Sequence, residues 1–179
     1  MIRAFAALAL PDSHRQQLAG YLEGCAAAHP GFRWVPAASL HLTLRFAGNL
    51  EEEACDRLRT ELHRIRHQSF EVRLGELGSF GGRLASVIWI GLAEGREPAA
   101  ELAAACELAC RAAGLAPEER PFRPHVTLAR ARSRRGEPAV ELAPLPELAA
   151  WRAESFVLYR SRLGGGPPVY EPLETYSLG

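Results

Sequence analysis

The sequence predicts a mixed α+β domain made of two similar halves. Helical and extended apolar periodicities are interspersed along the chain, and the order strand, helix, strand, hairpin occurs twice. The pattern His-x-Thr-Leu stands at the equivalent place in each half. Because no linker-like stretch separates the halves, we expect residues 1–179 to form a single domain with two lobes around a shared cleft.

The elements of the first half follow from local patterns. We expect a strand over 3–8, a helix from Pro11-Asp12 to about Ala28, and a short strand over 33–36. Alternating residues predict a strand over 41–47, and three glutamates open a helix over 51–67, where they suit the helix dipole. Strands over 69–78 and 85–92, joined by a turn with Gly81-Gly82, complete this half as a hairpin.

The second half repeats this order. An alanine-rich helix over 97–113 is closed by Gly114, and a strand over 125–131 leads into a polar loop from Ala131 to Pro138. Two long strands follow over 152–162 and 168–177, with a glycine- and proline-rich hairpin loop at 164–168 between them. The number of strands exceeds that of a strictly alternating parallel fold.

Composition and charge exclude several classes of protein. With 47% apolar and 23% charged residues, the chain is neither disordered nor fibrous. Its 21 basic residues, all arginine, balance 21 acidic ones, so any nucleic acid must be recognised locally. No apolar stretch approaches the roughly 18 residues that span a bilayer. We expect a cytoplasmic protein with no membrane contact, and its neutral charge favours a monomer.

The cysteines predict neither disulfides nor a metal site. Cys25, Cys55, Cys106 and Cys110 fall in predicted helices and form no Cys-x-x-Cys pair, so we expect small buried side chains. A typical catalytic zinc site needs three protein ligands, and neither His-x-Thr motif contains a carboxylate or a cysteine. The sequence therefore predicts no metal and no cofactor.

The two His-x-Thr motifs are the main functional signal. Alternate residues of a strand point to one face, so His41 projects beside Thr43, and His125 beside Thr127, while the intervening residues face the core. Two imidazoles and two hydroxyls can then surround a phosphate. One neutral imidazole can take a proton from water while the other, protonated, gives one to a leaving oxygen. The hydroxyls can donate to the non-bridging oxygens.

Arginines near the motifs are candidate phosphate ligands. Arg45 has the parity of His41 and is expected to face the groove, whereas Arg130 has the opposite parity to His125 and would need a bulge to reach it. The run from Arg130 to Arg135 could form a basic rim for RNA, or a solvated loop. Four aromatic residues could stack a base but are better explained by core packing: Trp34, Phe46, Trp89 and Phe122. The remaining histidines are expected on solvated surface: His14, His29, His63 and His67.

The paired motifs resemble those of the 2H phosphoesterase superfamily. The surrounding sequence is similar to the bacterial and archaeal RNA 2′,3′-cyclic phosphodiesterases, also called the 2′-5′ RNA ligase family. Four stretches carry the resemblance: residues 3–8, residues 34–36 with 40–48, residues 124–130, and Ser161, Leu163 and Tyr170 near the C-terminus.

The resemblance implies a bilobal fold with the active site in the groove between two pseudo-symmetric lobes, each with an antiparallel sheet and flanking helices. It implies metal-independent hydrolysis of RNA 2′,3′-cyclic phosphate ends, tRNA-like fragments included, to a 2′-phosphate, with reversible 2′-5′ ligation as a side activity. His41 would be the proton donor, His125 the proton acceptor, and Arg130 a phosphate ligand.

Three alternatives stay open at this point. The same four groups could open the cyclic phosphate of a small nucleotide such as ADP-ribose 1″,2″-cyclic phosphate. The fold could also serve as a nucleotide-binding module without catalysis, although intact histidines and threonines argue against it. A structural partner protein with accidental motifs is the third.

Overall fold

The computed structural model describes residues 1–162, 164 and 168–179. Three α-helices occur in this part of the chain: α1 (Asp12–Ala28), α2 (Glu52–Leu62) and α3 (Arg96–Ala112), with a short 3-10 helix η1 at Ala37–Ser39. The strands of the first half are β1 (Ile2–Ala9), β2 (Phe32–Trp34), β3 (His41–Leu50), β4 (Phe70–Phe80), β5 (Leu84–Ala85) and β6 (Val87–Glu94). Those of the second are β7 (His125–Ala131), β8 (Glu137–Pro138), β9 (Trp151–Ala153), β10 (Ser155–Arg162) and β11 (Val169–Ser177).

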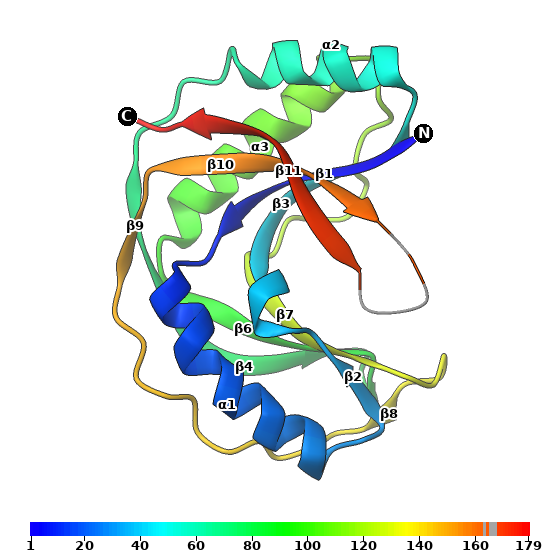
Figure 1. Ribbon diagram of the computed structural model, residues 1–179, viewed down its shortest axis with the longest axis vertical. Helices are drawn as coiled ribbons and strands as arrows, with labels where there is room; N and C mark the ends of the chain where they lie inside the picture. Colours follow the sequence, from blue (N-terminus) through cyan, green and yellow to red (C-terminus); the bar gives the residue numbers. More distant parts are fainter. Residues whose placement is uncertain (163, 165–167) are drawn as a thin grey trace.

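The described strands form one curled antiparallel sheet of nine strands, with a small separate pair β5-β8 (Figure 1). Its order is β11-β10-β1-β3-β7-β6-β4-β9, and β2 adds to β7. The two motif strands, β3 and β7, lie at the centre and share a single ladder pair, Leu42 with Val126. The α+β fold with two similar halves is therefore confirmed, but the halves are parts of one continuous sheet.

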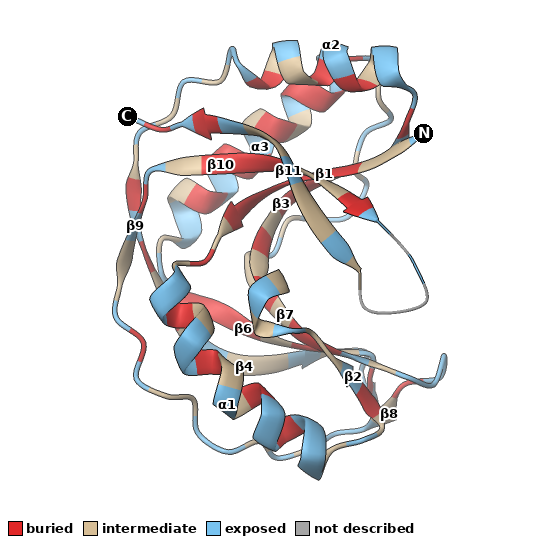
Figure 2. Ribbon diagram, in the orientation of Figure 1, coloured by how far each residue is buried: buried red, intermediate tan, exposed pale blue. Residues whose placement is uncertain are grey.

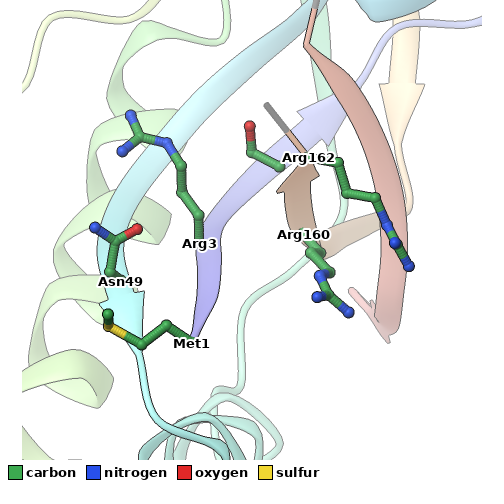
Figure 3. Close-up of a pocket in the computed structure, with 6 residues that line it drawn as sticks. Met1, Arg3, Asn49, Arg160 and Arg162 are labelled. Atoms are coloured by element: carbon green, nitrogen blue, oxygen red, sulfur yellow. The ribbon is translucent and has the colours of Figure 1, made fainter. Parts of the chain in front are cut away.

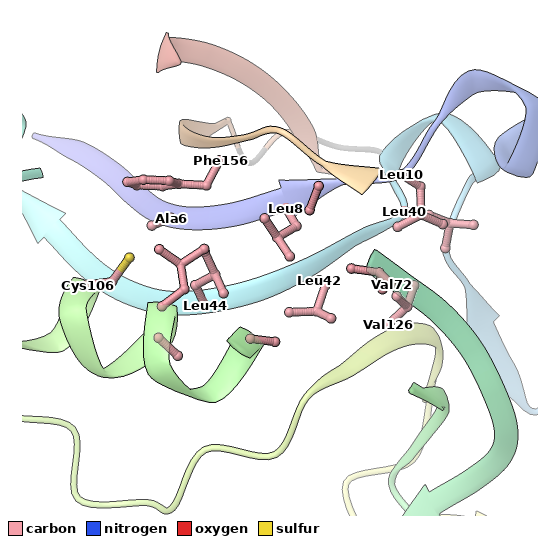
Figure 4. Close-up of a cluster of buried hydrophobic side chains, with 14 of the residues drawn as sticks. Ala6, Leu8, Leu10, Leu40, Leu42, Leu44, Val72, Cys106, Val126 and Phe156 are labelled. Carbon is pink, nitrogen blue, oxygen red and sulfur yellow. The ribbon is translucent and has the colours of Figure 1, made fainter. Parts of the chain in front are cut away.

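The helices interlock the two halves. Helix α1 follows β1 but packs against η1 and β2, which pairs with β7 of the other half. Helix α3, the first element of the second half, packs on β3 of the first half, with α2 beside it. Buried residues line the inner side of each helix and the central strands, whereas the outer helix faces are exposed (Figure 2). Figure 4 shows Leu44 of β3 directed toward Cys106 of α3 within this core.

Two predicted elements differ from the structure. Helix α2 ends at Leu62 rather than at residue 67, because Ile65 packs against the core from the non-helical chain that leads to β4. The strand expected over 152–162 is two strands, since β9 pairs with β4 whereas β10 pairs with β1. The chain thus changes from one half of the sheet to the other at Glu154. The hairpin loop expected at 164–168, and Leu163, lie largely outside the described residues.

Other expectations hold. The hairpin of β4 and β6 forms as predicted, and Gly114 has the left-handed φ of +88° that closes α3. All four cysteines are free and buried. Within the described residues, no helix is long and apolar enough to cross a membrane.

Candidate active site

The two central strands bring both His-x-Thr motifs to one face of the sheet. Leu42 and Val126 lie directly opposite each other in an antiparallel pair, so the residues that flank them face one another across the strands. His41 therefore lies across from Thr127, and Thr43 across from His125. The four side chains are half-buried, while the apolar residues between them are fully buried. The arrangement places two imidazoles and two hydroxyls around one point.

Both imidazole rings are held in the same way. Nδ1 of His41 lies 2.8 Å from the Ser39 carbonyl oxygen, and Nδ1 of His125 lies 2.6 Å from that of Arg123. Because a carbonyl only accepts, each Nδ1 carries the proton and donates it, which leaves Nε2 of each ring for a substrate. Each histidine thus bonds to the carbonyl two residues before it, so the pseudo-symmetry extends to the ring orientation.

Electrostatics at the site favours the neutral imidazoles. Burial lowers the pKa of His41, the hydrogen bond to Ser39 opposes this, and the charge of Arg130 lowers the pKa further. Burial likewise lowers the pKa of His125, with the Arg123 carbonyl opposing and Arg130 again lowering it. The charge of His125 also lowers the pKa of His41. Since protonating one ring disfavours protonation of the other, the pair is suited to holding one proton between them.

Aromatic side chains form a wall beside each histidine. Phe5 and Tyr170 lie 4.8 and 5.0 Å from the His41 ring, measured between ring centroids. Phe80 and Trp89 lie 5.1 and 6.3 Å from the His125 ring. These contacts join residues far apart in sequence, and they fix the rings while excluding water from one side of each.

A glycine makes room for the Trp89 ring beside His125. Gly78 of β4 pairs with Trp89 of β6, and a Cβ at residue 78 would stand 2.2 Å from the indole ring. No side chain other than hydrogen fits there without moving the ring. Gly78 therefore positions one wall of the site from two strands away.

A β-bulge in each motif strand decides where the nearby arginines lie. The pairing of β6 with β7 shifts between Ile88 and Trp89, so that Leu128 and Ala129 are both buried and Arg130 returns to the face of Thr127. The bulge that Arg130 would need is present. Its charge lowers the pKa of both catalytic-motif histidines and of Tyr170, as expected for a cation in the groove.

The corresponding bulge in β3 reverses the expectation for Arg45. The register of β1 with β3 shifts so that Ala7 pairs with Thr43 but Ala6 pairs with Arg45, which turns Arg45 to the core face. Only 8% of its side chain is exposed, and it forms an ion pair with Glu107 of α3. Its remaining donors reach the carbonyls of Phe46 and, at 2.7 Å, Ala116. The prediction that Arg45 faces the groove is therefore wrong.

Other sequence-based expectations have mixed outcomes. Within the arginine run, Arg132 donates to the Pro30 carbonyl, and the arginines at 134 and 135 are exposed. His14, expected at the surface, is buried, and its Nε2 contacts the Ala149 carbonyl at 2.8 Å. Arg15 of α1, which carries no motif signal, lies near enough for its charge to lower the pKa of His41. Among the described residues, no group of three His, Cys, Asp or Glu side chains could hold a metal ion.

Comparisons with known proteins match the chain over most of its length. A family model described as the 2′-5′ RNA ligase superfamily matches residues 10–165. The RNA 2′,3′-cyclic phosphodiesterase of Thermus thermophilus is 34% identical over 186 residues, covering 99% of this chain and 90% of the relative. That of Escherichia coli is 30% identical over 176 residues, covering 98% and 96%.

Solved structures show the same fold. Escherichia coli LigT complexed with 3′-AMP superposes with a TM-score of 0.84 at 29% identity, covering 99% of this chain and 98% of that one. A crystal structure titled as a phosphoesterase gives a TM-score of 0.84 at 30% identity, with the same coverage. From the family match, the relatives and the shared fold, the chain belongs to the 2′-5′ RNA ligase superfamily.

Proposed function

We propose that this enzyme is an RNA 2′,3′-cyclic phosphodiesterase that opens the cyclic phosphate by acid–base catalysis between two histidines. The proposal is supported by the pairing of Leu42 with Val126, which sets the two His-Thr pairs opposite each other on one face, and by the matched Nδ1 hydrogen bonds that leave Nε2 of both histidines for a substrate. Relatives at 27–34% identity over most of the chain that bear this name support the substrate class.

In the proposed reaction, Nε2 of neutral His125 takes a proton from water as the water oxygen bonds to phosphorus. The bond from phosphorus to the 3′-oxygen breaks, and His41 donates the proton that this oxygen needs. The products are a 2′-phosphate and a 3′-hydroxyl. The threonine hydroxyls and Arg130 stabilise the charge on the non-bridging oxygens. A 5′-hydroxyl in place of water would give a 2′-5′ linkage by the same steps.

The first test is turnover of an oligoribonucleotide that ends in a 2′,3′-cyclic phosphate, in excess EDTA, with the position of the product phosphate resolved. We expect a 2′-phosphate from the wild type and a loss of roughly a hundredfold or more in His41→Ala and in His125→Ala. His63→Ala is the matched control, since His63 is exposed and contacts Glu174 instead. Turnover indifferent to both motif histidines would refute the proposal.

The separate roles need a second experiment. A cyclic phosphate with sulfur at the 3′ position has a leaving group that departs without a proton. We expect this substrate to restore most of the rate of His41→Ala and little of the rate of His125→Ala, because only the former lacks the acid. The opposite rescue would exchange the two roles. Turnover of ADP-ribose 1″,2″-cyclic phosphate by the same enzyme tests the small-nucleotide alternative.

We also propose that the protein is a cytoplasmic monomer and that its substrates include tRNA-like fragments.

A further inference from the structure

The sheet face that carries the histidine quartet continues toward the start of β1. Phe5 contacts the His41 ring and therefore lies on the groove face. Phe46 pairs directly with Phe5, so the bulge that buries Arg45 places Phe46 on this same face. Phe46 in β3 thus occupies the position that Arg130 occupies in β7. The two equivalent positions therefore differ in chemistry: Arg130 in β7 is a cation, whereas Phe46 in β3 is aromatic.

A cation covers this aromatic ring. The guanidinium carbon of Arg3 lies 4.5 Å from the centroid of the Phe46 ring, in cation–π geometry. No carboxylate within the described part of the chain pairs with Arg3, and its side chain is only half-buried. The charge of Arg3 also acts on Tyr170, which touches His41. Arg3 is thus a cation held over Phe46 without an acidic partner among the described residues.

A pocket of about 360 Å³ opens beside Arg3. It is lined by side chains from three adjacent strands: Met1, Arg3, Asn49, Arg160, Ser161 and Arg162. Figure 3 shows Arg3 and Asn49 on neighbouring strands, with Arg160 and Arg162 on the other side of β1. Arg162 is paired with Glu171 at 2.7 Å, whereas no ion pair engages Arg3 or Arg160 within the described residues. The volume, together with the donors of Arg3 and Asn49, which pair with each other and share one face of the sheet, suits one nucleotide unit with its phosphate.

We propose that Arg3, stacked on Phe46, binds a phosphodiester of the RNA chain on the 5′ side of the cyclic phosphate, with the adjacent pocket receiving that nucleotide. The inference rests on the proposed function, and chemistry fixes the direction. A 2′,3′-cyclic phosphate ends the chain, so every further phosphate is on its 5′ side. Single-stranded RNA-binding grooves combine cations that hold the backbone with aromatic side chains beside them.

The distance along the strand indicates more than one nucleotide. Phe46 is five residues after His41, which corresponds to roughly 15 Å of strand. A mononucleotide cyclic phosphate therefore occupies the quartet without reaching Arg3, whereas a longer chain reaches it. The enzyme should discriminate substrates by length at this position.

The test compares Arg3→Gln with the wild type on a mononucleotide 2′,3′-cyclic phosphate and on di- and trinucleotides with the same end. We expect an unchanged kcat/KM for the mononucleotide and a loss of about tenfold for the trinucleotide, mainly in KM. The salt dependence of log KM for the trinucleotide should also fall by about 0.7 in slope, because one phosphate contact is lost.

Arg64→Gln is the matched control, since Arg64 is exposed just beyond the end of α2 and pairs with Glu61. We expect no length-dependent effect from it. Equal losses on all lengths in Arg3→Gln, or a trinucleotide loss in Arg64→Gln alone, would overturn the subsite. If the wild type opens no cyclic phosphate of any length, the proposed function itself fails, which separates the two outcomes.

Discussion

Replacement of Arg45 by methionine tests whether this residue supports the fold or contacts substrate. Its guanidinium is buried, pairs with Glu107 and donates to two backbone carbonyls. Removal of one partner of a buried ion pair costs about 3–5 kcal/mol. Glu107 keeps 24% of its side chain exposed and can be partly rehydrated, so we expect a loss of about 2–3 kcal/mol in the free energy of unfolding.

The assay is urea unfolding followed by circular dichroism, with kinetics on folded protein in parallel. Arg73→Met is the matched control, because Arg73 pairs with Glu94 while both side chains are about half exposed. We expect a loss of about 1 kcal/mol or less from the control. In the double variant Arg45→Met, Glu107→Leu, at least half of the stability should return, since no uncompensated charge remains.

The kinetic result decides between the two roles. A structural Arg45 predicts a KM within about twofold of the wild type for the folded variant. A loss of stability below about 0.5 kcal/mol, combined with a tenfold rise in KM, would refute the reasoning and return Arg45 to the groove.

The remaining predictions concern the quartet and its cation. Burial is the chief cause that lowers the pKa of both His41 and His125. His125, the base, therefore stays neutral to a pH below 6.5, and His41, the acid, already loses its proton below pH 6.5. The bell-shaped profile of kcat/KM should therefore peak on the acid side of pH 6.5, and a maximum above about pH 7 would contradict this. Because Arg130 lowers both pKa values, Arg130→Gln should move both limbs to higher pH while reducing kcat/KM; an unshifted profile would place its charge elsewhere. Thr43→Val and Thr127→Val should each lower kcat by about a hundredfold with unchanged pH limbs, as measured in single-turnover reactions, and a loss confined to KM would show that the hydroxyls only bind.

Sequence patterns predicted the quartet because it depends on local alternation. Residues two apart on a strand share a face whatever the rest of the fold does, so His41 with Thr43 and His125 with Thr127 could be placed without a structure. The same rule of alternation gave the wrong face for Arg45, two residues after Thr43. A bulge adds a residue to one strand and inverts the parity of all that follows, and nothing in the residue types around Arg45 signals it.

Contacts between residues far apart in the chain could not be predicted from the sequence. Phe5 and Tyr170 lie at opposite ends of the chain, yet both contact His41, and only the order of strands in the sheet brings them together. The split at Glu154 has the same origin, because local β propensity is continuous there while the pairing partner changes. Arg15 influences the pKa of His41 from a helix that shows only a surface pattern in sequence.

The exchange of helices between the halves has a consequence for how the chain could be divided. Helix α1 belongs by sequence to the first half but packs against β2, which pairs with β7 of the second half, whereas α3 of the second half packs on β3 of the first. A fragment that ended after α2 would leave the face of β3 that packs on α3 open to water. We therefore expect neither fragment to fold alone, and the two to regain activity only when mixed. The duplicated pattern of the sequence thus describes two halves that have similar structures but do not fold independently.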